Sequence, residues 1–284
     1  MSVVPKARPE STGQLAGAAP WRAWRAARVT AVTELGQWSH VASTVTMVVT
    51  QLLLTWWLWR ALYAGTATSA GLGVHQATTY ALLGVLYMRF RLVDRWANGD
   101  NMMLLVREGT IAYLFLRPVS PRRYYLIRGV GDLAYGAGWA AAGYIACRAL
   151  GMVSPPASGS AGLAAVITLA FGLVIVYYLQ LVVDLLCFWS VVNGNAVTAL
   201  AFVQNLLSGA MAPLWFFPLW FQRADGWLPF QGTLNVPLSL YIGRLPLSAL
   251  GHEVAVQALW CAALAAGCAL LWRRAAARVI VQGG

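Results

Sequence analysis

Long charge-free stretches recur along the chain and are the clearest feature of its hydrophobic pattern. Three of them are sharply bounded, at Val41–Trp59, Ala161–Val183 and Val254–Trp272. Each is long enough for a helix to cross about 30 Å of hydrocarbon. The pattern therefore predicts an all-α integral membrane protein that contains at least these three spans.

Three further spans are less sharply bounded. The second and third are expected at about residues 71–88 and 133–147, each closed by charged residues. A charge-free run at 185–222 is too long for one span, and its prolines predict a helix end near Met211. The fifth span is thus expected at about 191–211, and the chain is predicted to have six transmembrane helices.

The N-terminal region has a different pattern. Residues 1–20 contain several Pro, Gly and Ser residues and are predicted to be a disordered tail, with 21–284 forming the transmembrane domain. Between Trp21 and Trp38, three arginines recur at helical spacing among apolar residues. This predicts a basic amphipathic helix on the membrane surface, although a cytosolic helix on a soluble partner stays possible.

Composition excludes several classes of protein. Hydrophobic residues make up 60% of the chain and charged residues only 10%, whereas a soluble domain carries about 25% charged residues. The chain is therefore neither an ordinary soluble enzyme nor a disordered protein.

The net charge of +11 has two interpretations, a nucleic-acid surface or basic loops beside the membrane. With the N-terminus inside, only four of the 20 Lys and Arg residues fall outside, namely Arg60, Arg148, Arg223 and Arg244. The charge thus predicts topology, with both termini cytoplasmic, and no nucleic-acid partner.

Candidate chemistry is sparse. The only lysine is Lys6, so no Walker A motif is present and any ATP-driven work must come from another chain. The three histidines are far apart, and the four cysteines form no CxxC pair. We expect no metal and no cofactor in this chain. A secondary transporter and a membrane-embedded lipid-modifying enzyme remain alternatives.

The segment between the second and third spans is too long for a simple turn. It mixes short apolar runs with charges, broken at Gly109 and Pro118. One interpretation is a segment at the membrane face that presents Arg107 and Glu108 to a soluble partner. The other is a solvated loop with incidental charges.

This segment also carries a resemblance to a known family. The sequence REGTI at 107–111, followed by LRPV at 116–119, resembles a recurrent stretch of ABC-2 permeases, the membrane subunits of type-2 ABC exporters. The PLSLYIGR sequence at 237–244 and the residues at 278–284 are similar to later family patterns. The likeness covers roughly residues 21–284.

The resemblance implies a fold and a set of partners. It implies an N-terminal elbow helix at Trp21–Trp38, six spans, a cytoplasmic coupling segment and re-entrant extracellular helices within 212–250. It also implies a bacterial inner-membrane exporter whose ATP and Mg²⁺ are bound by a separate ATPase dimer. A second permease is expected, with a heterodimer favoured over a homodimer, and membrane lipids surround both.

Two groups of candidate site residues follow. For coupling to the ATPase we expect the charged residues of the first cytoplasmic segment: Arg95, Asp100, Arg107, Glu108 and Arg117. For the translocation path we expect polar residues inside the first and fifth spans: Gln51, Thr55, Gln204, Asn205 and Ser208. Ordinary surface charges and interhelical hydrogen bonds are the competing explanations.

Overall fold

The computed structural model describes residues 27–28, 31–32, 35–65, 68–69, 71–91, 102–111, 113, 120–189 and 194–282. The predicted tail at 1–20 and most of the predicted surface helix lie outside these residues, as do Arg95, Asp100 and Arg117.

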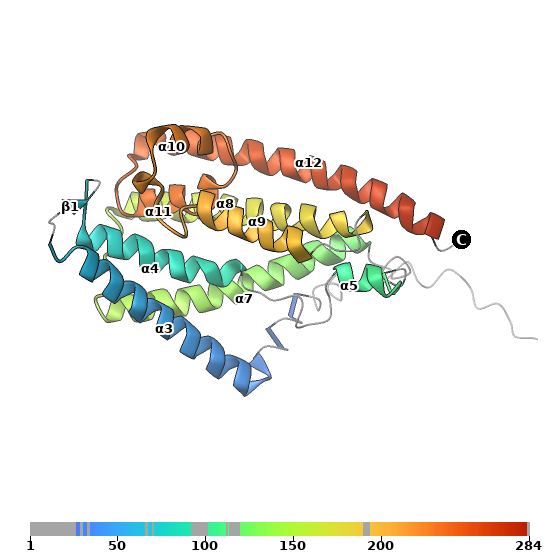
Figure 1. The fold of residues 1–284 in the computed structure, drawn as a ribbon, viewed down its shortest axis with the longest axis horizontal. Helices are drawn as coiled ribbons and strands as arrows, with labels where there is room; N and C mark the ends of the chain where they lie inside the picture. Colours follow the sequence, from blue (N-terminus) through green and yellow to red (C-terminus); the bar gives the residue numbers. More distant parts are fainter. Residues whose placement is uncertain are drawn as a thin grey trace, which may run out of the picture.

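In the part of the chain that the structure describes, six longer helices run roughly along one axis (Figure 1). They are α3 (Trp38–Leu62), α4 (Val74–Arg91), α7 (Pro121–Ala149), α8 (Gly159–Leu185), α9 (Gly194–Leu207) and α12 (Leu250–Gln282). Among the described residues, three helical stretches are long and apolar enough to cross a membrane, at Trp38–Leu62, Gly159–Phe188 and Leu247–Ala276. The predicted helical architecture is thus confirmed, with three apolar helices of membrane-crossing length, whereas the number of six spans stays a prediction.

Several helices differ from their predicted bounds, and α12 extends beyond the predicted span Val254–Trp272 at both ends. Helix α7 begins at Pro121, well before the predicted span at 133–147, because a proline fits the first helical turn and no breaker follows it. Helix α9 ends at Leu207 rather than near Met211, and Gly209 just beyond it has a φ of +80°. That left-handed conformation stops the helix before the prolines are reached.

Short elements connect the long helices. Strands β1 (Thr68–Ser69) and β2 (Leu72–Gly73) form an antiparallel pair in which Thr68 faces Gly73. Helix α5 (Met102–Arg107) lies between α4 and α7, and the 3₁₀ helix η3 (Leu186–Phe188) follows α8.

Residues 212–250, between α9 and α12, form a compact unit that we call the short-helix module. Prolines precede or begin several of its elements, which keeps each helix short. Its elements are η4 (Leu214–Phe216), α10 (Leu219–Asp225), η5 (Gln231–Thr233), α11 (Asn235–Tyr241) and η6 (Leu247–Ala249). Short helices are thus present where they were predicted, and their re-entry into the membrane stays a prediction.

The buried core of the described residues forms three clusters, one of which joins α3, α4 and α7. Figure 1 shows the short-helix module and β1 at one end, and α5 with the C-terminal end of α12 at the other. At the module end, α11 packs on α8 within a cluster that includes Tyr80, Trp215 and Leu234. At the α5 end, a second cluster joins Met102, Tyr125, Leu185 and Trp272 from four different elements. Successive long helices begin at opposite ends of the bundle, so they alternate in direction (Figure 1).

Candidate functional site

A cavity of about 300 Å³ lies between α3 and α4. Gln51 and Thr55, one helical turn apart on α3, form part of its wall opposite α4. Ala210, just after α9, contributes to the same wall, so segments from three predicted spans meet there. The structure thus brings the two polar residues predicted on the first span together at one cavity.

A buried arginine is associated with this cavity. Arg89 of α4 is only 6% exposed, and its Nη2 donates a hydrogen bond to Oε1 of Gln51 at 3.3 Å. In the sequence, Arg89 is only one of the charged residues that close the second predicted span. A cation buried between two membrane helices is costly and marks a candidate site for a polar or anionic ligand.

The polar residues predicted on the fifth span do not line this cavity. Gln204 and Ser208 of α9 are both buried, and Asn205 is half-buried. Just beyond them, the hydroxyl of Tyr80 on α4 contacts the carbonyl of Gly209 at 3.4 Å and Oδ1 of Asn235 at 3.1 Å. The structure therefore does not join the two predicted groups into one site.

An ion pair inside α7 was not predicted. Nε of Arg128 lies 3.7 Å from Oδ1 of Asp132, and both side chains are buried. The predicted third span excluded both residues because hydropathy alone set its start. The sequence did carry a signal for this ion pair, because residues four apart lie on the same face of a helix and these two have opposite charges.

At the opposite end from the module, α5 is anchored by its apolar face. Met102 and Ile111 are buried against η3 and the C-terminal part of α8. Arg107 and Glu108 are exposed at the end of α5, where Gly109 adopts a φ of +72°. The segment therefore presents one basic and one acidic side chain outward from a buried apolar base.

The short-helix module is fastened to the bundle by buried polar contacts. Nε2 of Gln257 on α12 donates to the carbonyls of Thr168 on α8 (2.9 Å) and Gly232 (2.6 Å). The hydroxyls of Tyr144 on α7 and Tyr241 on α11 lie 2.8 Å apart. Gln76 of α4 donates to the carbonyl of Ile242 at 3.1 Å. Polar contacts from α4, α7 and α12 thus hold the module in place, and Gln257 also joins α12 to α8.

Several arginines belong to helices that reach the α5 end of the bundle. Among the described residues, Arg107, Arg122, Arg123, Arg273 and Arg274 belong to elements at the α5 end. No three His, Cys, Asp or Glu side chains in the described part of the chain lie close enough to hold a metal ion.

A sequence model of one protein family, described as "ABC-2 family transporter protein", matches residues 46–283. The match extends from α3 to the end of α12 and thus covers most of the chain. No curated protein and no solved structure matches the chain.

Proposed function

The chain belongs to the ABC-2 family of transporters, and we propose that it is the permease subunit of an ATP-driven exporter served by a separate ATPase. As a membrane subunit of an ABC transporter, it is not itself an enzyme. In this proposal ATP and Mg²⁺ bind to a dimer of the ATPase, and this chain provides the path and the mechanical coupling. The protein would lie in the bacterial inner membrane with both termini in the cytoplasm.

The observation that carries the coupling role is the arrangement of α5. Its apolar face is buried in a cluster with residues of α7, α8 and α12, while Arg107 and Glu108 remain exposed. A close-packed cluster transmits displacement because it cannot be compressed. A force applied to the exposed end by a closing ATPase would therefore reach three long helices at once.

The proposed path uses the cavity between α3 and α4. Gln51 and Thr55 supply hydrogen-bonding groups at that cavity, and Arg89 holds Gln51 through a hydrogen bond. The apolar side chains of Val85 and Met88, which also line the cavity, would contact the apolar part of a substrate. We propose that a second permease closes the open side of this cavity. A related chain, giving a heterodimer, is favoured over an identical one. Gln204, Asn205 and Ser208 would line a later stage of the path.

Charge reversal at Glu108 tests the coupling proposal. We expect Glu108→Arg to insert normally into the membrane but to lose export, because the ATPase groove that accepts α5 would meet a repelling charge. Export and ATP hydrolysis would be measured on the complex co-expressed with its ATPase, together with the amount of ATPase that co-purifies.

Arg223→Glu is the matched control, since Arg223 is an exposed charge on α10 at the opposite end of the bundle. Normal export by Glu108→Arg would refute the role of α5. Failure of the wild-type chain to co-purify with any ATPase, with or without nucleotide, would refute the exporter proposal itself.

A further inference from the structure

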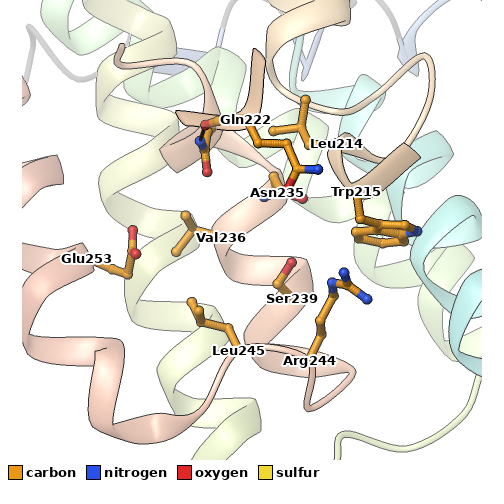
Figure 2. A pocket seen from close by; sticks show the side chains of 10 residues that line it. Leu214, Trp215, Gln222, Asn235, Val236, Ser239, Arg244, Leu245 and Glu253 are labelled. Atoms are coloured by element: carbon orange, nitrogen blue, oxygen red, sulfur yellow. Dashed lines mark hydrogen bonds between the residues drawn. The ribbon is translucent and has the colours of Figure 1, made fainter. Parts of the chain in front are cut away.

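Two cavities in the described part of the chain differ in the charges around them. The cavity in the short-helix module, of about 170 Å³, has charges of both signs, and Figure 2 shows Arg244 and Glu253 at its opposite edges. The cavity between α3 and α4 is lined only by uncharged residues. One of them, Gln51, is hydrogen-bonded to Arg89. A positive charge therefore lies directly behind a wall of the α3–α4 cavity.

The guanidinium of Arg89 is buried without an anion among the described residues. Its only hydrogen bond to a described residue is the one that Nη2 donates to Gln51. Its Nε has no hydrogen-bond partner in that part of the chain. A buried cation is costly unless an opposite charge offsets it. The position of Arg89 therefore favours an anion in the adjoining cavity and disfavours a second cation.

Arg89 also fixes the orientation of the Gln51 amide. A guanidinium has five N–H donors and no acceptor, so it can bond only to the amide oxygen. Oε1 of Gln51 is thus occupied, while Nε2 has no hydrogen-bond partner among the described residues. Because Gln51 lines the cavity, its two N–H groups are the donors at that wall. The hydrogen bond from Arg89 polarises the amide and strengthens these donors.

The other walls suit a molecule with one polar end. Thr55 lies one turn beyond Gln51, and its hydroxyl bonds to no described residue. Val85 and Met88 make the facing wall apolar. The volume of about 300 Å³ is about twice that of a cavity that holds benzene. A buried cluster that joins α3, α4 and α7 holds the two walls together.

We propose that the exported molecule is an amphiphile whose polar end is a carboxylate, and that Arg89 is the positioning residue that selects it. The proposal rests on the proposed function, since it assigns a substrate class to the same cavity. The carboxylate accepts hydrogen bonds from Nε2 of Gln51 and the hydroxyl of Thr55, and its single charge offsets that of Arg89. A phosphate monoester carries nearly two charges and leaves one unbalanced.

Photoaffinity labelling of the purified full-length chain in nanodiscs tests the selection. Three probes would share one diazirine-bearing alkyl chain and end in a carboxylate, a hydroxyl or an ammonium group. We expect the acid to label the wild-type chain about tenfold more than the alcohol does, the scale of one charge-assisted hydrogen bond. The amine is expected to label least. The labelled peptides should contain residues 51–55 or 84–88.

Gln51→Glu keeps the size of the side chain but removes the selection. The new carboxylate would pair with Arg89, so both the free N–H groups and the unbalanced charge are lost. We expect labelling by the acid to fall about tenfold and labelling by the alcohol to change much less. Arg89→Gln should also lose the preference, whereas Arg89→Lys, which keeps the charge, should retain it. Arg60→Gln, at an exposed position in the last turn of α3, is the control.

Gly84→Leu tests the location of the site. A Cβ atom at Gly84 meets nothing within 4 Å, so a leucine side chain has room to enter the cavity. We expect labelling by all three probes to fall. Equal labelling of the wild-type chain by acid and alcohol, an unchanged acid preference in Gln51→Glu, or normal labelling of Gly84→Leu would overturn the proposal. A loss of preference in Arg89→Lys as large as in Arg89→Gln would exclude the charge as its cause.

ATP hydrolysis by the complex separates this proposal from the exporter proposal. We expect the acid to stimulate hydrolysis, and Gln51→Glu to raise its half-maximal concentration more than it lowers the maximal rate, because binding is what the variant weakens. If the labelling keeps its acid preference but no probe stimulates hydrolysis, the exporter proposal fails and the binding site does not. Equal stimulation by all three probes would contradict selection by charge and leave the exporter proposal intact.

Discussion

At the scale of single residues, Asp225 is a carboxylate buried under conditions that favour its protonated form. It ends α10, is 1% exposed, and neither side-chain oxygen has a hydrogen-bond partner among the described residues. Burial raises the pKa of Asp225 to about 7, whereas an unfolded Asp has a pKa of about 3.9. Between about pH 4 and pH 7, Asp225 is therefore protonated in the folded chain and ionised in the unfolded chain.

From this difference we expect the module to gain stability as pH falls from about 7 toward 4, and to show no further change from this group above pH 7. Asp225→Asn removes the titrating group and should unfold a few degrees higher than wild type at pH 8. Thermal unfolding of both proteins at pH 8.0 and 5.5 measures the effect. The same pH dependence in the two proteins would exclude Asp225 as its source.

Some of the candidate site residues were accessible from the sequence and others were not. The four-residue spacing of Gln51 and Thr55 predicted a shared helix face, and both line one cavity. Arg89 was missed because an arginine at a span end usually reaches the headgroups. Its burial depends on Gln51 of another helix. Contacts between distant segments of this kind leave no local pattern in a single sequence.

At the scale of elements, hydropathy located the long helices but not their ends. The charged residues Arg128 and Asp132 lowered the hydropathy around the start of α7, yet the helix continues through them because they pair with each other. Conversely, the charge-free run after α8 contains several separate elements, since glycine and proline geometry sets their bounds. A hydropathy window reports solvent preference and not backbone geometry.

Close packing between α8 and the module provides a prediction at this scale. A Cβ atom at Gly172 would lie 2.7 Å from the carbonyl oxygen of Gly232 and 2.9 Å from Cα of Thr233. Because both contacts are backbone, Gly172→Ala should separate η5 from α8 and destabilise the chain by about 1–3 kcal/mol. The midpoint of thermal unfolding in detergent measures this loss.

Gly138→Ala is the matched control for Gly172→Ala. A Cβ atom at Gly138 of α7 meets nothing within 4 Å in this chain. Alanine in a helix is more favourable than glycine by about 0.5–1 kcal/mol, so this variant should be neutral or slightly stabilised. A similar loss of stability in both variants would show that η5 does not depend on the close approach to Gly172.

At the scale of the whole molecule, the two ends carry different chemistry. The α5 end combines exposed charges with a cluster that reaches four elements. The module end combines exposed aromatic residues with polar cavities. The sequence predicted this polarity through the distribution of its basic residues. It did not predict that α8 would contact α9, α11 and α12, because helix neighbours depend on the shapes of side chains far apart in the chain.

If the two ends lie on opposite sides of the membrane, single cysteines placed at each end will differ in accessibility. Trp227→Cys lies in the module at an 84% exposed position, and Tyr113→Cys follows α5 at a 68% exposed position. We expect a membrane-impermeant maleimide to label Trp227→Cys in intact cells and Tyr113→Cys only after permeabilisation. The wild-type chain is the background control, because three of its four cysteines are buried and Cys261 is half-buried. Labelling of Tyr113→Cys in intact cells would reverse the proposed orientation.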